Sequence, residues 1–215
     1  MNSVQFANWL PTLLSGLKIT VLASVISIAT SIAWGCVVSM IVATNNKILT
    51  LLFRIYTSIF RNSPLLVQIF FFYYALPYVG IKFSALMCGV IAIMLNEGAF
   101  IAEILRGSIK NIPKGEVEAA YSLGLTKFQV VTTIIFPLAL RASIPMITGQ
   151  SSIVIKDTSL FSMIMILDLT RAGSVFYSKF FNTTSFYICG FLYILLFMIF
   201  SISGKQIEKR VKVGR

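Results

Sequence analysis

Long apolar segments separated by short polar ones run through the whole chain. Three uncharged runs cover residues 19–46, 62–81 and 180–204, and shorter apolar stretches at 83–96 and 127–155 contain single polar or charged residues. A helix of about 20 apolar residues is long enough to cross the hydrocarbon core of a bilayer. Five membrane spans are therefore predicted, near residues 19–43, 58–79, 83–105, 130–155 and 184–204.

The composition supports this interpretation. Of the 215 residues 57% are hydrophobic and only 12% are charged, which is about half the charged share of a soluble domain. Because the backbone polar groups of a segment in lipid must be satisfied within it, helices are the structure that such apolar runs adopt. We therefore expect an all-α, multi-pass integral membrane protein with one transmembrane domain over residues 1–215 and no separate soluble domain.

The formal net charge of +11 would suggest a nucleic-acid partner for a soluble protein. In a membrane protein the same excess follows the positive-inside rule, under which Lys and Arg gather in cytoplasmic loops. Placing the N-terminus outside puts the basic residues of 47–61, 106–141 and the tail 205–215 on the inner side, thirteen of the eighteen in the chain. The predicted orientation is N-out and C-in, with no nucleic-acid partner.

The N-terminal stretch and the cysteines lead to two further expectations. The N-terminal stretch 8–18 can lie on the outer membrane surface, with Trp9 as its anchor. The sequence has no histidine, and Cys36, Cys88 and Cys189 all lie in apolar stretches. We expect these cysteines to be buried as small hydrophobic residues, and we expect this chain to bind no metal.

The longest polar segment between spans, residues 106–129, predicts a short helix on the cytoplasmic side. Pro113 interrupts the preceding helix and suits the start of a new one. Glu116 and Glu118 then fall near the new N-terminus, where the helix dipole favours negative charge. Gly124 is the predicted terminator of this helix.

A second helix start follows at once. Thr126 and Gln129 have the spacing of a capping box, in which each side chain bonds to the other residue's backbone N–H. Acidic and small residues dominate 116–122, whereas a helix lying on lipid is rich in Lys and Arg. Docking of a soluble partner is therefore favoured over lipid contact. The residues that share one helical face are Val117, Ala120, Tyr121, Gly124, Leu125 and Phe128.

Charged groups inside the spans are costly and usually face a bundle interior or a cavity. Glu97, Glu103 and Asp157 are the carboxylates in this position. Asn96 and Glu103 lie two helical turns apart on one face, with Phe100 between them. These groups could bind the ammonium of an amino acid, or they could serve structure alone.

The two interpretations remain open for Glu103, because Arg106 at i+3 could pair with it. For Asp157, which is followed by Thr158 and Ser159, the substrate pathway is favoured although Lys156 could neutralise it. Arg61 is interpreted as a boundary residue that extends its charge to the cytoplasmic interface.

Several motifs resemble those of a known family. Glu118-Ala119-Ala120, Gly124, Ile134 and Pro137 match a signature of the form E-A-A, three residues, G, nine residues, I-x-L-P, with Phe136 in place of leucine. This signature is that of the permease subunits of binding-protein-dependent ABC importers. The stretches at 61–77, 96–120 and 155–173 are similar to motifs of the polar amino-acid subfamily, with its glutamine-, histidine- and glutamate-type permeases.

The resemblance implies the type I ABC importer permease fold in a bacterial inner membrane and a non-catalytic translocation subunit. The sequence lacks the G-x-x-x-x-G-K-[ST] loop, so ATP and Mg would be bound by a partner ATPase dimer. A second permease subunit and an extracytoplasmic solute-binding protein are the other implied partners, with glutamine or glutamate favoured as the solute. The residues implied to contact the ATPase are Glu116, Glu118, Ala119, Ala120, Tyr121, Leu123 and Gly124.

A different class of function remains as the alternative. Glu97, Glu103 and Asp157 could form an ion or proton relay in a self-sufficient secondary transporter or channel. Such proteins are often built from two inverted repeats, and the five predicted spans of this chain show no internal repeat. The sequence therefore favours the ATP-driven importer.

Overall fold

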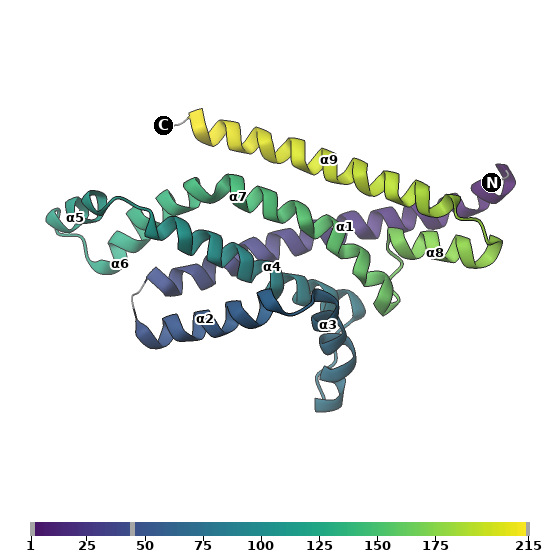
Figure 1. The fold of residues 1–215 in the computed structure, drawn as a ribbon, viewed down its shortest axis with the longest axis horizontal. Coiled ribbons are helices and arrows are strands. Elements are labelled where there is room, and N and C mark those ends of the chain that lie inside the picture. Colours follow the sequence, from purple (N-terminus) through teal and green to yellow (C-terminus); the bar gives the residue numbers. More distant parts are fainter. Residues whose placement is uncertain (1–2, 44–45, 214–215) are drawn as a thin grey trace. The chain divides into compact units, whose positions relative to one another are not determined.

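In a computed structural model the chain is described for residues 3–43 and 46–213, and these residues contain helices and no strand (Figure 1). Arg215, the last residue of the predicted basic tail, lies outside this part. The α-helices are α1 Ser3–Ala43, α2 Lys47–Asn62, α3 Leu65–Phe70, α4 Ala85–Lys110, α5 Lys114–Ser122, α6 Lys127–Gln129, α7 Phe136–Asp157, α8 Leu169–Phe180 and α9 Thr184–Val213. The π-helical segments are η1 Phe71–Ala75 and η3 Val130–Ile135, and the 3₁₀ segments are η2 Leu76–Val79 and η4 Thr158–Ile164.

Four helical segments of the described chain are long and apolar enough to cross a membrane: Gln5–Ile41, Ala85–Lys110, Lys127–Ile164 and Thr184–Lys209. A shorter apolar helix covers Leu65–Val79. The chain is thus a multi-pass helical membrane protein. The count of five spans and the orientation stay predictions.

The predicted span near residues 58–79 is interrupted in the structure. Helix α2 ends at Asn62, Ser63 is extended (φ −103°, ψ 144°), and Pro64 precedes α3. Proline lacks an N–H and its ring disfavours the helical conformation of the residue before it. The helix therefore breaks at residues 63–64 and starts again.

The contacts divide the chain into two compact units. Unit 1 comprises residues 1–29, 64–93 and 151–202, and unit 2 comprises residues 30–63, 94–150 and 203–215. Helices α1, α4, α7 and α9 each contribute residues to both units, so the units are not successive domains of the sequence.

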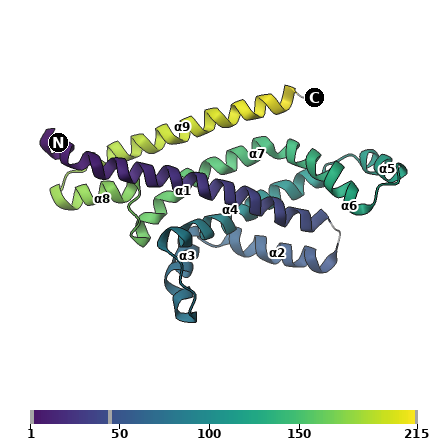
Figure 2. The ribbon, with the colours of Figure 1, turned by 180° about the vertical axis from the view of Figure 1, so that it is seen from behind.

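Within unit 1, α8 packs on the first part of α1, as both views show (Figures 1 and 2). The Trp9 indole is 4% exposed and donates a hydrogen bond to the Ala172 carbonyl, with 2.9 Å between donor and acceptor. A Cβ at Gly16 would lie 2.7 Å from the Asp168 carbonyl oxygen, so only glycine allows this approach. The expectation that Trp9 anchors the chain in the membrane interface is wrong, because α8 covers the indole.

A second core of unit 1 forms between α1, α3, α4, α7 and η4. Its fully buried residues include Ala23, Ile69, Ile93, Val154 and Phe161. Cys88 and Cys189 are buried as predicted, Cys36 is only half-buried, and none of the three forms a disulfide within the described chain.

Within unit 2, α2 runs antiparallel beside the last part of α1 and beside α4 (Figure 1). The Trp34 indole donates to the Tyr56 hydroxyl at 2.9 Å, and that hydroxyl donates to the Leu95 carbonyl at 2.6 Å. A Cβ at Gly98 would lie 2.7 Å from the Trp34 ring. This glycine therefore lets α1 and α4 approach closely enough for α2 to pack against both.

Candidate functional site

One face of α4 turns its polar residues toward α2 in unit 2. The Asn96 side-chain amide donates to the Phe60 carbonyl at 2.6 Å, and the Phe100 ring lies under the Arg61 guanidinium, 5.0 Å from its Cζ atom. Glu103, one turn further on, also contacts α2. The predicted common face of Asn96, Phe100 and Glu103 is confirmed.

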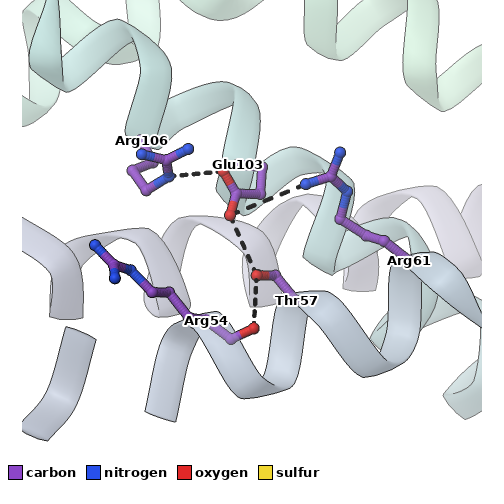
Figure 3. Close-up of polar contacts among 5 residues, drawn as sticks. All are labelled: Arg54, Thr57, Arg61, Glu103 and Arg106. Carbon is purple, nitrogen blue, oxygen red and sulfur yellow. Dashed lines mark hydrogen bonds and ion pairs between the residues drawn. The ribbon is translucent and has the colours of Figure 1, made fainter. Parts of the chain in front are cut away.

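Glu103 is the centre of this cluster (Figure 3). Its Oε2 accepts a hydrogen bond from Arg106 Nε at 2.6 Å, and its Oε1 accepts one from the Thr57 hydroxyl at 3.2 Å. Arg61 Nη1 lies 3.9 Å from the same Oε1. The anticipated pairing with Arg106 is therefore formed, and Arg61 adds a second, looser ion pair. Arg61 points at a carboxylate, which the interpretation as a boundary residue did not anticipate.

Glu97 lies on another face of α4 and is 2% exposed. Its Oε2 accepts a hydrogen bond from the Gln150 side-chain amide of α7, at 2.9 Å. Sequence reasoning did not select Gln150, because 53 positions separate it from Glu97 and it belongs to no charged motif.

The remaining predicted pathway residues, Asp157, Thr158 and Ser159, lie in unit 1, where α7 changes into η4. Asp157 is half-buried, and its carboxylate accepts no hydrogen bond from a described residue. The Lys156 ammonium lies over the Phe197 ring, 5.0 Å from its centroid, rather than in an ion pair with Asp157. Thr158 is fully buried and donates to the Ile155 carbonyl at 2.8 Å, whereas Ser159 is half-buried.

The short helix predicted within residues 106–129 is α5, and its end has the predicted form. Gly124 has φ +81°, a left-handed conformation that residues with a Cβ adopt at a cost. The Gly124 N–H donates to the Tyr121 carbonyl at 2.9 Å, and the Leu125 N–H donates to the Ala120 carbonyl at 3.3 Å. This pair of bonds is a Schellman motif.

The next helix begins two residues later with the predicted capping box. The Thr126 N–H donates to Gln129 Oε1 at 2.9 Å, and the Gln129 N–H donates to the Thr126 hydroxyl oxygen at 3.4 Å. Both halves of the sequence prediction for this loop are confirmed.

Most of the proposed coupling residues are exposed in unit 2. Ala120 alone is buried, because α5 packs against η3 on that side. Leu123 is 82% exposed, Phe128 77% and Tyr121 48%. Glu116, Glu118, Ala119 and Gly124 are exposed as well. Large apolar side chains exposed together on one loop are typical of a protein interaction surface.

A buried carboxylate that sequence reasoning missed lies in unit 1. Asp168 precedes α8 as its N-cap and accepts hydrogen bonds from the Arg171 N–H at 2.8 Å and the Tyr193 hydroxyl at 3.2 Å. Burial raises the pKa of this carboxyl from 3.8 to about 6, although the hydrogen bonds from Arg171 and Tyr193 oppose the rise. An aspartate placed just before an amphipathic stretch is the N-cap signal that could have identified it.

The helices and the exposed loop around α5 define a class of protein: a polytopic helical membrane protein with a short exposed helix between two of its apolar helices. Residues 35–213 match the family described as the binding-protein-dependent transport system inner membrane component. The chain belongs to this family of ABC importer permeases.

Individual relatives cover nearly the whole chain. A putative glutamine transport system permease protein of Rickettsia felis is 34% identical over 207 residues, 94% of each chain. The glutamine transport system permease protein GlnP of Escherichia coli K12 is 32% identical over 95% of this chain and 94% of its own length.

Solved structures share the fold. A crystal structure of an amino acid ABC transporter with histidines superposes with a TM-score of 0.86 at 26% identity, covering 98% of this chain and 99% of that one. The methionine ABC transporter MetNI in an inward-facing conformation superposes with a TM-score of 0.72 at 17% identity. The fold is therefore that of the type I ABC importer permeases.

Proposed function

We propose that this chain is the permease subunit of an ATP-driven importer that moves a polar amino acid, glutamine or glutamate, across the bacterial inner membrane. The observation that carries the proposal is α5 with its Schellman turn at Gly124, inside a chain that belongs to the ABC importer permease family. The relatives' names, glutamine transport system permease proteins, support the solute class.

The coupling step follows from the form of the loop. Helix α5 is short, follows α4 in the chain and packs against η3, and Tyr121 and its C-cap Leu123 are exposed. A partner ATPase would hold this helix in a groove and move it when ATP binds. Because the turn at Gly124 and the capping box at Thr126 stiffen the junction, the motion would reach α7 rather than being absorbed in a loose loop.

The other subunits follow from the same family. Two permease subunits, identical or different, would enclose one pathway, and an ATPase dimer would bind ATP and Mg on the cytoplasmic side. A solute-binding protein would deliver the amino acid from outside. Asn96, Glu97, Glu103, Asp157, Thr158 and Ser159 are the proposed pathway residues of this chain.

Reconstitution tests the proposal. The chain is placed in proteoliposomes with its ATPase and solute-binding protein, and uptake of radiolabelled glutamine and glutamate is measured with and without ATP. Uptake that requires ATP and both partners supports the proposal. Uptake by the chain alone, driven by a proton or sodium gradient, would support the secondary transporter instead.

A further inference from the structure

We propose that Arg61 and Glu103 together bind the zwitterionic head of the transported amino acid, with its carboxylate on the Arg61 guanidinium and its ammonium on the Glu103 carboxylate. The inference rests on the proposed function and adds a recognition site to it. It also gives Arg61 a role in the pathway, where the sequence indicated only a boundary residue.

The contacts of Arg61 hold its guanidinium in position but leave N–H donors available for a ligand. Its guanidinium lies over the Phe100 ring at 5.0 Å and 3.9 Å from Glu103, and 38% of the side chain remains exposed. A separation of 3.9 Å is too long for a hydrogen bond. A guanidinium has five N–H donors in a planar fork that matches a carboxylate. Arg61 can therefore accept a carboxylate from solution while Phe100 keeps it in place.

Glu103 is held in place by different neighbours. Arg106 Nε binds its Oε2 at 2.6 Å and the Thr57 hydroxyl binds its Oε1 at 3.2 Å, which fixes the carboxylate plane (Figure 3). A carboxylate has about four acceptor positions, and these two hydrogen bonds take two of them. Glu103 can therefore accept an ammonium, and Arg106 and Thr57 act as positioning residues.

The basic residues of α2 require a polar environment. Lys47, Arg54 and Arg61 recur every seven residues, so they share one face, and each is exposed. Because α2 runs antiparallel to the spanning helix α1 within unit 2, Arg61 lies about 21 Å along the helix from Lys47. Arginines packed beside a spanning helix face the bundle interior or a water-filled pathway rather than lipid. A solute moving along this pathway would meet Arg61 and Glu103.

The charge pattern favours a zwitterion over a simple ion. Arg61 and Arg106 flank Glu103 and would attract an anion. The Glu103 carboxylate would repel any anion that approached it closely. An α-amino acid carries its ammonium and its carboxylate a few ångströms apart. Arg61 Nη1 and Glu103 Oε1 are 3.9 Å apart, so each charge of the amino acid can meet a group of opposite charge. The pair therefore selects the common head group of amino acids and leaves the side chain to other residues.

The experiment uses the assembled transporter in proteoliposomes with radiolabelled glutamine as the probe. Arg61→Gln and Glu103→Gln are expected to lower glutamine uptake by about 10- to 100-fold, the range for losing one charge-assisted hydrogen bond, while ATP hydrolysis stays within about twofold. Arg54→Gln is the matched control: Arg54 lies on the same face of the same helix, its guanidinium points away from Glu103 (Figure 3), and its variant should stay within about twofold.

Binding separates recognition from a structural role. Equilibrium binding of glutamine to the permease–ATPase complex without the solute-binding protein is expected for the wild type and the Arg54→Gln variant, and is expected to be lost in the other two. Glutamine methyl ester and N-acetylglutamine, which each lack one charge, should not compete. Should Arg61→Gln fail to assemble, Arg61→Lys keeps the ion pair but not the fork, and its affinity should fall at least several-fold.

Suppose that the wild type takes up glutamine with ATP and that the Arg61→Gln and Glu103→Gln variants behave like Arg54→Gln. This result would overturn the site and leave the proposed function intact. Reduced uptake with unchanged glutamine binding would assign the pair a structural role and overturn it too. A wild type without ATP-driven uptake would instead overturn the proposed function.

Discussion

The buried polar side chains of this protein are satisfied by partners far away in the sequence. Asn96 reaches the Phe60 carbonyl, Glu97 reaches Gln150, and Leu169 donates its N–H to the Thr20 hydroxyl. Each of these groups would be costly to bury alone. The sequence marks which residues need a partner, but it does not indicate which partner they find.

Asp168 offers a residue-scale prediction about pH. Its folded-state pKa of about 6 lies above the unfolded value of 3.8, so the folded state binds the proton more tightly. The free energy of unfolding should therefore rise as pH falls from 7 toward 4, by about 1 kcal/mol between pH 7 and 5. Thermal unfolding of the purified protein, followed against pH, measures this contribution.

Asp168→Asn is the matched comparison, because asparagine keeps the N-cap geometry and does not titrate. The difference in stability between wild type and variant should change across pH 7 to 5 with the stated sign. A difference that is constant with pH would show that Asp168 is not the titrating group.

Asp157 carries the second residue-scale prediction. The Asp157 carboxylate accepts no hydrogen bond within the described chain, so Asp157→Asn should leave the assembly with the ATPase unchanged. If the carboxylate binds the solute, the variant should lower amino-acid uptake by about tenfold or more, the range for one lost charged hydrogen bond. Co-purification and uptake measure the two effects. Loss of assembly together with uptake would show that Asp157 has a structural role.

At the scale of elements, turns and helix caps were predicted correctly where all the residues that form them are close together in the sequence. The turn at Gly124 and the capping box at Thr126 involve residues at most five positions apart, so their pattern predicts their structure. The second predicted span is interrupted because Pro64 breaks the helix, although the hydropathy over 58–79 is continuous. Pro11, in contrast, lies inside α1 without ending it.

Gly124→Val is the prediction for this element. Gly124 has a φ of +81°, and a Cβ at this position would meet open space. The backbone conformation, and not crowding within the chain, therefore requires glycine here. A side chain with a Cβ costs about 1–2 kcal/mol in the left-handed region, so the turn should open and the amount of amino acid moved per ATP should fall several-fold. Uptake and ATP hydrolysis are measured together in proteoliposomes.

Gly190→Val is the control, because Gly190 also has open space around it but is not in the left-handed region. It should leave the ratio of uptake to hydrolysis within about twofold of wild type. Equal behaviour of the two variants would count against a coupling role for the turn.

At the scale of the whole molecule, the orientation remains the main prediction. N-out and C-in places α5 in the cytoplasm and α8 outside. Ser122 of α5 and Ser178 of α8 are both exposed. After the three native cysteines are replaced by alanine, Ser178→Cys should react with a membrane-impermeant maleimide in intact spheroplasts, and Ser122→Cys should react only after the membrane is opened. The reverse pattern would invert the orientation.

The sequence by itself determined the class of the protein, four of the spans in outline, and the form of α5 with the turn and cap that follow it. Hydropathy, proline, glycine and capping residues act through the solvent and through near neighbours, so their pattern can be interpreted without the fold. Only the tertiary structure decided that α8 buries Trp9, that Gln150 holds Glu97 and that Arg61 meets Glu103. These contacts depend on how helices pack, and packing brings together residues whose separation along the chain carries no periodic signal.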